Sequence, residues 1–269
     1  MKNKFNVPMI VVLAVIVISS LYDELNNVNQ PKSGDTASIK GNASERSALY
    51  AMRAADNTWP VISDNGNAMQ VDDLTRKNYY LVLDGSGSMG DNNCSNGQSK
   101  IDVAKTAVVK FIKKIPDNAN IGLVIFDGRG NFERTPLGSK NKNGAIHQIR
   151  QASSGGGTPL KSSIQHAYQS LSAQAIKQLG YGEYHLVVIT DGEASQGEEP
   201  RYIVQDLLNH SPVVLHTIGF CIKGGHSLNQ AGNTFYKSAN NPEQLATGLE
   251  SVLAEAPDFK ADTFEGQAQ

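Results

Sequence analysis

The stretch Tyr79-Tyr80-Leu81-Val82-Leu83-Asp84-Gly85-Ser86-Gly87-Ser88 decides the fold of this chain. Its continuous apolar run is typical of a strand that is buried on both faces of a sheet. A carboxylate and two hydroxyls follow at alternate positions, and the glycines between them allow a tight turn that brings these side chains together. Oxygen donors of this kind suit hard cations such as Mg²⁺. The stretch therefore predicts a buried strand that ends in a candidate cation site.

Two later segments repeat parts of this pattern. Val187-Val188-Ile189-Thr190-Asp191-Gly192-Glu193 is a second apolar strand that ends in an aspartate, and Gly155-Gly156-Gly157-Thr158-Pro159 opens a helix. Thr158 has two interpretations, because threonine before proline is also a common helix N-cap. The three glycines are not needed by a cap, and they favour a loop that approaches an ion closely. Ligands of open α/β sheets bind at the carboxyl ends of the strands, where both aspartates lie.

Apolar strands alternate with amphipathic helices from residue 78 onward. This order predicts an α/β fold, Rossmann-like and doubly wound, with a mostly parallel central sheet and helices on both faces. We expect strands at 79–83, 121–126, 185–190 and 213–219, with a short last strand at 234–236. Helices are expected from the 3.6-residue apolar spacing over 101–115, 164–175, 202–208 and 242–253.

Asp84-x-Ser86-x-Ser88, Thr158 and Asp191 together resemble the metal-ion-dependent adhesion site (MIDAS) of the von Willebrand factor type A (VWA) family. The resemblance covers roughly residues 78–255. It implies that the hydroxyls coordinate Mg²⁺ (or Mn²⁺ or Ca²⁺) directly, and that the aspartates do so directly or through water. It also implies a protein ligand that presents an Asp or Glu carboxylate to the ion, and one short antiparallel edge strand, expected at 134–137.

The two cysteines, Cys94 and Cys221, are candidates for a single disulfide if the chain is exported. If the strand order follows the VWA family, one other strand separates the strands that precede them, and their loops emerge at the same sheet edge. Two unpaired thiols are the alternative.

The chain is expected to divide into four parts. Residues 1–22 combine lysines with an apolar stretch, as a signal peptide or signal anchor does. Residues 23–75 read as a polar tether with short ordered segments, 76–256 as the VWA domain and 257–269 as a loose tail. Trp59, in the tether, is expected to pack on the flank of the domain. The leader predicts an extracytoplasmic protein of the periplasm or cell envelope, either anchored in the inner membrane or secreted.

The formal net charge of −2 and the pI near 6.3 argue against nucleic-acid binding. We expect no catalytic residues and no enzyme. The predicted function is a membrane-anchored or exported VWA domain that binds a protein partner through its metal, in adhesion or as an envelope scaffold. One alternative is a metal-dependent hydrolase or phosphatase that uses Asp84, although such phosphatases need a second carboxylate where Ser86 stands. The other is a structural module whose metal only stiffens the loops.

Overall fold

The structure is a computed structural model that describes residues 59–60, 71–222, 226–230 and 234–254. The expected leader at 1–22, the tail at 257–269 and most of the expected tether lie outside these residues, so the four-part division stays a prediction. Within the described ranges, no helix has both the length and the apolar character needed to cross a membrane.

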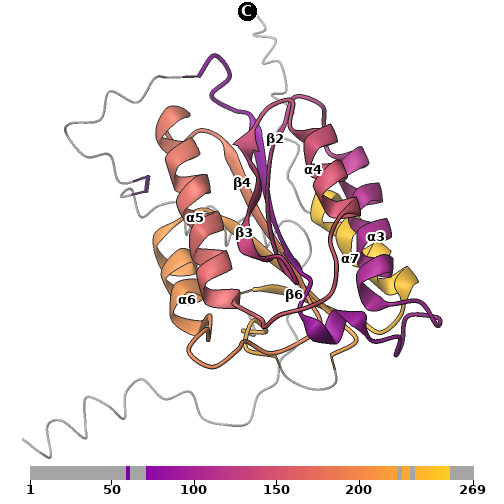
Figure 1. The fold of residues 1–269 in the computed structure, drawn as a ribbon. Helices are drawn as coiled ribbons and strands as arrows, with labels where there is room; N and C mark the ends of the chain where they lie inside the picture. The colour runs from indigo at the N-terminus through magenta and orange to yellow at the C-terminus, as the bar shows by residue number, and fades with distance from the viewer. Residues whose placement is uncertain (1–58, 61–70, 223–225, 231–233, 255–269) are drawn as a thin grey trace, which may run out of the picture. The chain divides into compact units, whose positions relative to one another are not determined.

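A six-stranded sheet forms the centre of the fold, in the order β3-β2-β1-β4-β5-β6. Every neighbouring pair is parallel except β2 with β3. The parallel strands are β1 (Lys77–Asp84), β2 (Asn120–Asp127), β4 (Glu183–Thr190), β5 (Val214–Phe220) and β6 (Phe235–Ala239), and β3 (Gly130–Gly138) is the antiparallel edge strand (Figure 1). The predicted α/β fold class, with a mostly parallel sheet and one antiparallel edge strand, is confirmed.

Helices cover both faces of the sheet (Figure 1). On one face lie α3 (Lys100–Lys114), α4 (Lys142–Arg150) and α7 (Pro242–Ala254), and on the other lie α5 (Leu160–Lys177) and α6 (Arg201–His210). A short 3-10 helix, η1 (Gly87–Gly90), follows β1.

Two features at the β3 edge differ from the sequence analysis. The edge strand begins at Gly130 and not at residue 134, and α4 was not expected. Residues 130–132 are exposed, so this part of β3 has no apolar run to reveal it. Helix α4 buries only Ala145, Ile146 and Ile149, which is too few for a clear helical period.

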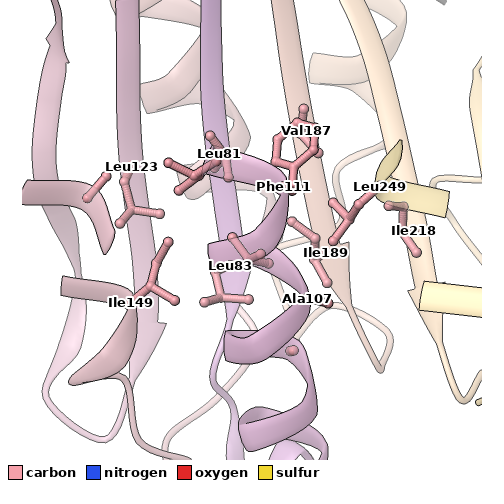
Figure 2. Packing of buried hydrophobic residues seen from close by; sticks show 14 of the residues in the cluster. Leu81, Leu83, Ala107, Phe111, Leu123, Ile149, Val187, Ile189, Ile218 and Leu249 are labelled. Carbon is pink, nitrogen blue, oxygen red and sulfur yellow. The ribbon is translucent and has the colours of Figure 1, made fainter. Parts of the chain in front are cut away.

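Two apolar layers result from the alternation of side chains along each strand. Leu81 and Leu83 of β1 face α3 and α7, where Phe111 and Leu249 pack against them and their neighbours (Figure 2). Tyr80 and Val82 face the opposite way, toward α5 and α6. The continuous apolar run of β1 is thus explained by burial on both faces, and it leads the chain directly to Asp84.

Trp59 packs on the flank of the domain, as predicted. Its ring meets that of Tyr184 edge to face, with centroids 4.9 Å apart, and its indole Nε1 donates to Ser172 Oγ at 3.2 Å. The tryptophan is therefore part of the packing around β4 and α5.

Candidate metal-binding site

The two predicted aspartates lie side by side at the carboxyl end of the sheet. Asp84 is the last residue of β1, and Asp191 follows the end of the neighbouring parallel strand β4. The register pairs Leu83 with Ile189, so the two strands end at nearly the same level. Asp84 is fully buried and Asp191 is 8% exposed. Two carboxylates are thus held almost out of water on adjacent strands.

Hydrogen bonds join four of the five predicted residues in one cluster. Ser86 Oγ and Ser88 Oγ lie 3.2 Å apart, and Ser88 Oγ donates to Asp191 Oδ1 at 2.7 Å. On the other carboxylate, Asp84 Oδ1 accepts from the Ser86 backbone N–H at 2.7 Å, and Oδ2 accepts from Thr190 Oγ1 at 2.6 Å. The sequence spacing therefore does bring these side chains to one point.

Backbone contacts bring the glycine loop that carries Thr158 to the same edge. Gly87 N donates to Gly156 O at 3.1 Å and Gly155 N to Gly85 O at 2.8 Å. Helix α5 begins at Leu160 with Pro159 as its N-cap residue, so the alternative role of Thr158 as the cap is not realised. The Thr158 hydroxyl makes no hydrogen bond with any described residue, although its backbone N–H donates to Ser195 Oγ at 2.8 Å. This oxygen is therefore available to a ligand.

Glycine is required where these loops meet. A Cβ on Gly85 would lie 2.9 Å from the Ser153 carbonyl oxygen and 3.0 Å from that of Phe126, both of them backbone atoms. Gly156 has a φ of +82°, which side chains rarely adopt. The glycines thus serve the packing of loop against loop, which in turn positions Ser86, Ser88 and Thr158.

The surroundings of the Asp84 carboxylate raise its pKa. Burial, with a smaller contribution from the nearby charge of Asp191, raises the pKa of Asp84 to about 6, although hydrogen bonds from Ser86 and Thr190 act against this rise. A carboxylate held out of water beside a second one is stabilised by a cation. The surroundings of Asp84 therefore favour an ion at this end of the sheet.

A third carboxylate at this edge, Asp127 at the end of β2, already has its positive partners. Its side chain is completely buried, with Arg134 Nη2 at 2.8 Å from Oδ1 and Arg129 Nη2 at 3.1 Å from Oδ2. Burial alone would raise its pKa, but hydrogen bonds from Arg129 and the charge of Arg134 outweigh that and hold the pKa of Asp127 below its usual range. Asp127 is therefore saturated by the protein itself, in contrast to Asp84.

Three residues at the site were not predicted from the sequence: Lys100, Thr190 and Ser195. Thr190 Oγ1 donates to Asp84 Oδ2, and Ser195 Oγ accepts from the backbone N–H of Thr158. Lys100 Nζ lies 2.8 Å from Asp191 Oδ2, and both side chains are buried. One signal was available for Lys100: it stands in the first turn of α3, where the helix dipole disfavours a cation, so its charge requires a local partner.

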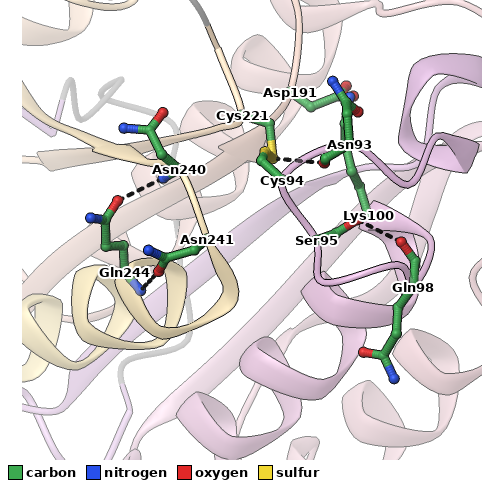
Figure 3. Close-up of a disulfide and its surroundings, with 10 residues drawn as sticks. All are labelled: Asn93, Cys94, Ser95, Gln98, Lys100, Asp191, Cys221, Asn240, Asn241 and Gln244. Carbon is green, nitrogen blue, oxygen red and sulfur yellow. Dashed lines mark hydrogen bonds and ion pairs between the residues drawn. A yellow bond between two sulfur atoms is a disulfide. The ribbon is translucent and has the colours of Figure 1, made fainter.

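The predicted disulfide between Cys94 and Cys221 is present (Figure 3). Its Cα atoms are 6.1 Å apart, and its two cysteines have a sequence separation of 127. β4 is the one strand between β1 and β5, as expected. Cys94 lies in the loop between η1 and α3, and Cys221 follows β5. The bridge thus joins the end of β5 with the loop that precedes Lys100.

The donor set fits a hard divalent cation. The described part of the chain holds no group of three or more His, Cys, Asp or Glu side chains that could bind a metal. The candidate site instead combines two carboxylates with the hydroxyls of Ser86, Ser88 and Thr158, and oxygen donors alone are what Mg²⁺ prefers. It offers neither the thiolate nor the imidazole ligands that softer metals prefer.

The family model of the von Willebrand factor type A domain matches residues 78–264. The chain belongs to this family. VWA domains are generally protein-interaction modules without enzymatic activity.

Individual relatives are distant. The uncharacterized protein YwmD of Bacillus subtilis is 26% identical over 192 residues, which are 64% of this chain and 83% of that protein. Among solved structures, the pilus adhesin SpaC from Lactobacillus rhamnosus GG matches with a TM-score of 0.55 at 15% identity, over 70% of this chain and 31% of that one. Proximal thread matrix protein 1 from the mussel byssus, solved with a zinc-occupied MIDAS motif, matches with a TM-score of 0.53 at 20% identity, over 68% and 48%. At such identities the structural matches show the fold.

Proposed function

We propose that this VWA domain binds a protein partner through a divalent cation held by Asp84, Ser86, Ser88, Thr158 and Asp191. The observation that carries the proposal is the cluster in which Ser86, Ser88 and Asp191 are joined by hydrogen bonds beside the buried carboxylate of Asp84. The zinc-occupied MIDAS of the mussel protein, which shares this fold, supports the assignment. Mg²⁺ is the proposed occupant, with Mn²⁺ or Ca²⁺ as substitutes.

Each residue has a defined task in this proposal. A serine hydroxyl has one proton and two acceptor lone pairs, so Ser88 can donate to Asp191 and still offer oxygen to a cation. Thr190 fixes the orientation of the Asp84 carboxylate, and Ser195 fixes the backbone of Thr158. The bound ion supplies a positive charge and an open coordination position to an Asp or Glu carboxylate of the partner.

The location that we propose is extracytoplasmic, at the cell envelope. The supporting observations are the leader-like residues 1–22 and the disulfide, which belongs to oxidising compartments. The adhesin SpaC shares the fold. Together they favour an exported or envelope-anchored domain that acts in adhesion or as a scaffold. The hydrolase alternative gains no support, because Ser86 cannot supply the second carboxylate.

Calorimetric titration of the chelator-treated protein with Mg²⁺ and Mn²⁺ tests the metal site. We expect one ion per chain in the wild type and none in Asp84→Ala. Asp117→Ala is the matched control, because the side chain of Asp117 is 96% exposed and pairs with Lys142. The absence of heat in the wild type, or equal binding in Asp84→Ala, would overturn the proposal.

Capture of partners from an envelope fraction tests the role of the ion. Immobilised wild-type protein should retain its partner in Mg²⁺, release it in EDTA and retain it again when Mg²⁺ is restored, whereas Asp84→Ala should retain none. Retention that is insensitive to EDTA would place partner binding on another face of the domain. A variant that loses thermal stability but keeps the partner would instead support the structural module.

A further inference from the structure

The ion pair between Lys100 and Asp191 lies inside the candidate site. Lys100 Nζ and Asp191 Oδ2 are 2.8 Å apart, and the two side chains are 5% and 0% exposed (Figure 3). Removing both charges from water costs free energy that the attraction between them seldom exceeds. A buried pair at a ligand site therefore calls for an explanation other than stability.

Lys100 is built into the site by its place in α3. It is the first residue of the helix, and side chains there lean back over the amino terminus, toward the sheet edge. Its backbone N–H donates to Asp91 O at 2.8 Å, and Ser99 caps the helix by accepting from Asp102 N. The Cys94–Cys221 bridge anchors the same loop. Several independent restraints thus hold an ammonium group where the helix dipole opposes it.

The two oxygens of Asp191 have different partners. Oδ1 accepts from Ser88, which belongs to the proposed ligand set, and Oδ2 contacts Lys100. Lys100 therefore orients the carboxylate so that Oδ1 faces the candidate ligands. It also changes the charge of the site: two carboxylates and one ammonium leave one negative charge, so a divalent ion brings the loaded site to one positive charge.

We propose that Lys100 is a built-in counter-charge that weakens cation binding and makes the loaded site select an anionic ligand. This inference rests on the proposed function, and it names the property that determines ligand specificity. In a partly buried site a nearby ammonium repels the ion, and it attracts the carboxylate that completes the ion's shell. Without Lys100 the loaded site would be neutral, and its preference for a carboxylate over a neutral oxygen ligand would fall.

Lys100→Met removes the charge at nearly constant length, and Lys100→Gln removes it while keeping a hydrogen-bond donor. The full-length protein is titrated with Mg²⁺ in a calorimeter. Both variants should bind Mg²⁺ on the order of tenfold more tightly than the wild type, because a like charge has been removed. Lys114→Met is the matched control, since Lys114 lies in the same helix and forms an exposed ion pair with Glu250. It should bind as the wild type does.

The selectivity is measured with acetate and its neutral analogue acetamide at constant ionic strength. Mn²⁺ bound to the protein enhances water-proton relaxation, and a ligand that displaces water from the open position lowers the enhancement. Acetate should compete more strongly than acetamide in the wild type and in Lys114→Met. In Lys100→Met and Lys100→Gln the preference should shrink several-fold, and Lys100→Arg should restore it.

The outcomes separate the two proposals. If the wild type binds Mg²⁺ but the neutral variants match it in metal affinity and in acetate preference, the role of Lys100 is overturned and the proposed function stands. If only the neutral variants bind Mg²⁺, the counter-charge is supported and the proposed function fails for the wild type. If no variant binds, both fail. If a neutral variant has a lower melting temperature than the wild type, Mg²⁺ should raise that temperature. A melting temperature that Mg²⁺ does not raise overturns the role of Lys100.

Discussion

Two polar clusters, one at each end of the central sheet, are buried in opposite ways. At the amino-terminal end, neutral amides satisfy one another: Asn78 Nδ2 donates to Gln178 Oε1 at 2.9 Å, and Asn120 Nδ2 donates to Asn78 Oδ1 at 2.7 Å. Gln178 Nε2 donates to the carbonyls of Leu74 and Arg76. At the carboxyl end, carboxylates, hydroxyls and one ammonium are gathered, and the Thr158 hydroxyl is without a partner among the described residues.

This difference distinguishes a structural polar cluster from a binding site. Neutral groups that pair completely inside a protein fix the arrangement of the chain and have nothing left for a ligand. Buried charges that the protein neutralises only in part can be stabilised further by a ligand of opposite charge. We therefore expect changes at the amino-terminal end to alter stability alone, and changes at the carboxyl end to alter binding first.

The disulfide should make the largest contribution to stability. Its loop spans 127 residues, for which the chain-entropy treatment gives roughly 5 kcal/mol, and measured values are often lower. Urea unfolding of the double variant Cys94→Ser/Cys221→Ser should show a loss of about 3–4 kcal/mol. The wild type in reducing buffer should match the variant. A loss below about 1 kcal/mol would mean that the loop is held by its other contacts.

Asn78→Ala should lower the free energy of unfolding by about 2–3 kcal/mol, because it leaves buried amide and carbonyl groups of Gln178, Asn120 and Glu183 without their partner. Mg²⁺ affinity should not change. Asn143→Ala, at an exposed asparagine of α4, is the control and should stay within about 0.5 kcal/mol. A large change in Mg²⁺ affinity in Asn78→Ala would contradict the division between the two ends.

His216, near the amino-terminal end of β5, should make stability depend on pH. Burial, with the nearby charges of His185 and Lys237, holds the pKa of His216 well below its usual range. Below pH 6.5, His216 is therefore protonated in the unfolded chain but neutral in the folded chain. The free energy of unfolding should fall as the pH falls below 6.5, by up to about 1.4 kcal/mol per pH unit. His216→Phe should have a shallower slope of stability against pH. His210→Gln, at an exposed histidine, should run parallel to the wild type.

Asp84→Asn should change stability least. In EDTA its free energy of unfolding should lie within about 1 kcal/mol of the wild-type value, because the amide keeps the size and the hydrogen bond from Ser86 while a buried charge is removed. Mg²⁺ should raise the melting temperature of the wild type and leave that of the variant unchanged. A loss of 3 kcal/mol or more in EDTA would show that Asp84 is chiefly structural.

Strands with a strong local signal could be predicted, and segments whose structure depends on neighbours could not. The run at 79–83 and the residues 186–189 within the predicted strand 185–190 are apolar throughout, and both lie in central strands. The exposed start of β3 and the short helix α4 gave no such signal. β3 is positioned by pairing with β2, and α4 by packing against α3 and β2. The structure of these two segments is decided by tertiary contacts and not by their own sequence.

The sequence by itself determined the α/β architecture and the position of Asp84 and Asp191 at strand ends, because apolar periodicity and residue chemistry are local properties. It offered Cys94 and Cys221 as candidates for a bridge, and the tertiary structure joined them. Only the tertiary structure decided that Asp127 is neutralised by Arg129 and Arg134 while Asp84 is not, and that Lys100 pairs with Asp191. A lysine 91 residues away from its partner has no signature in spacing. Its charge acts at the site because parallel strands end together there and the first turn of α3 is held beside them.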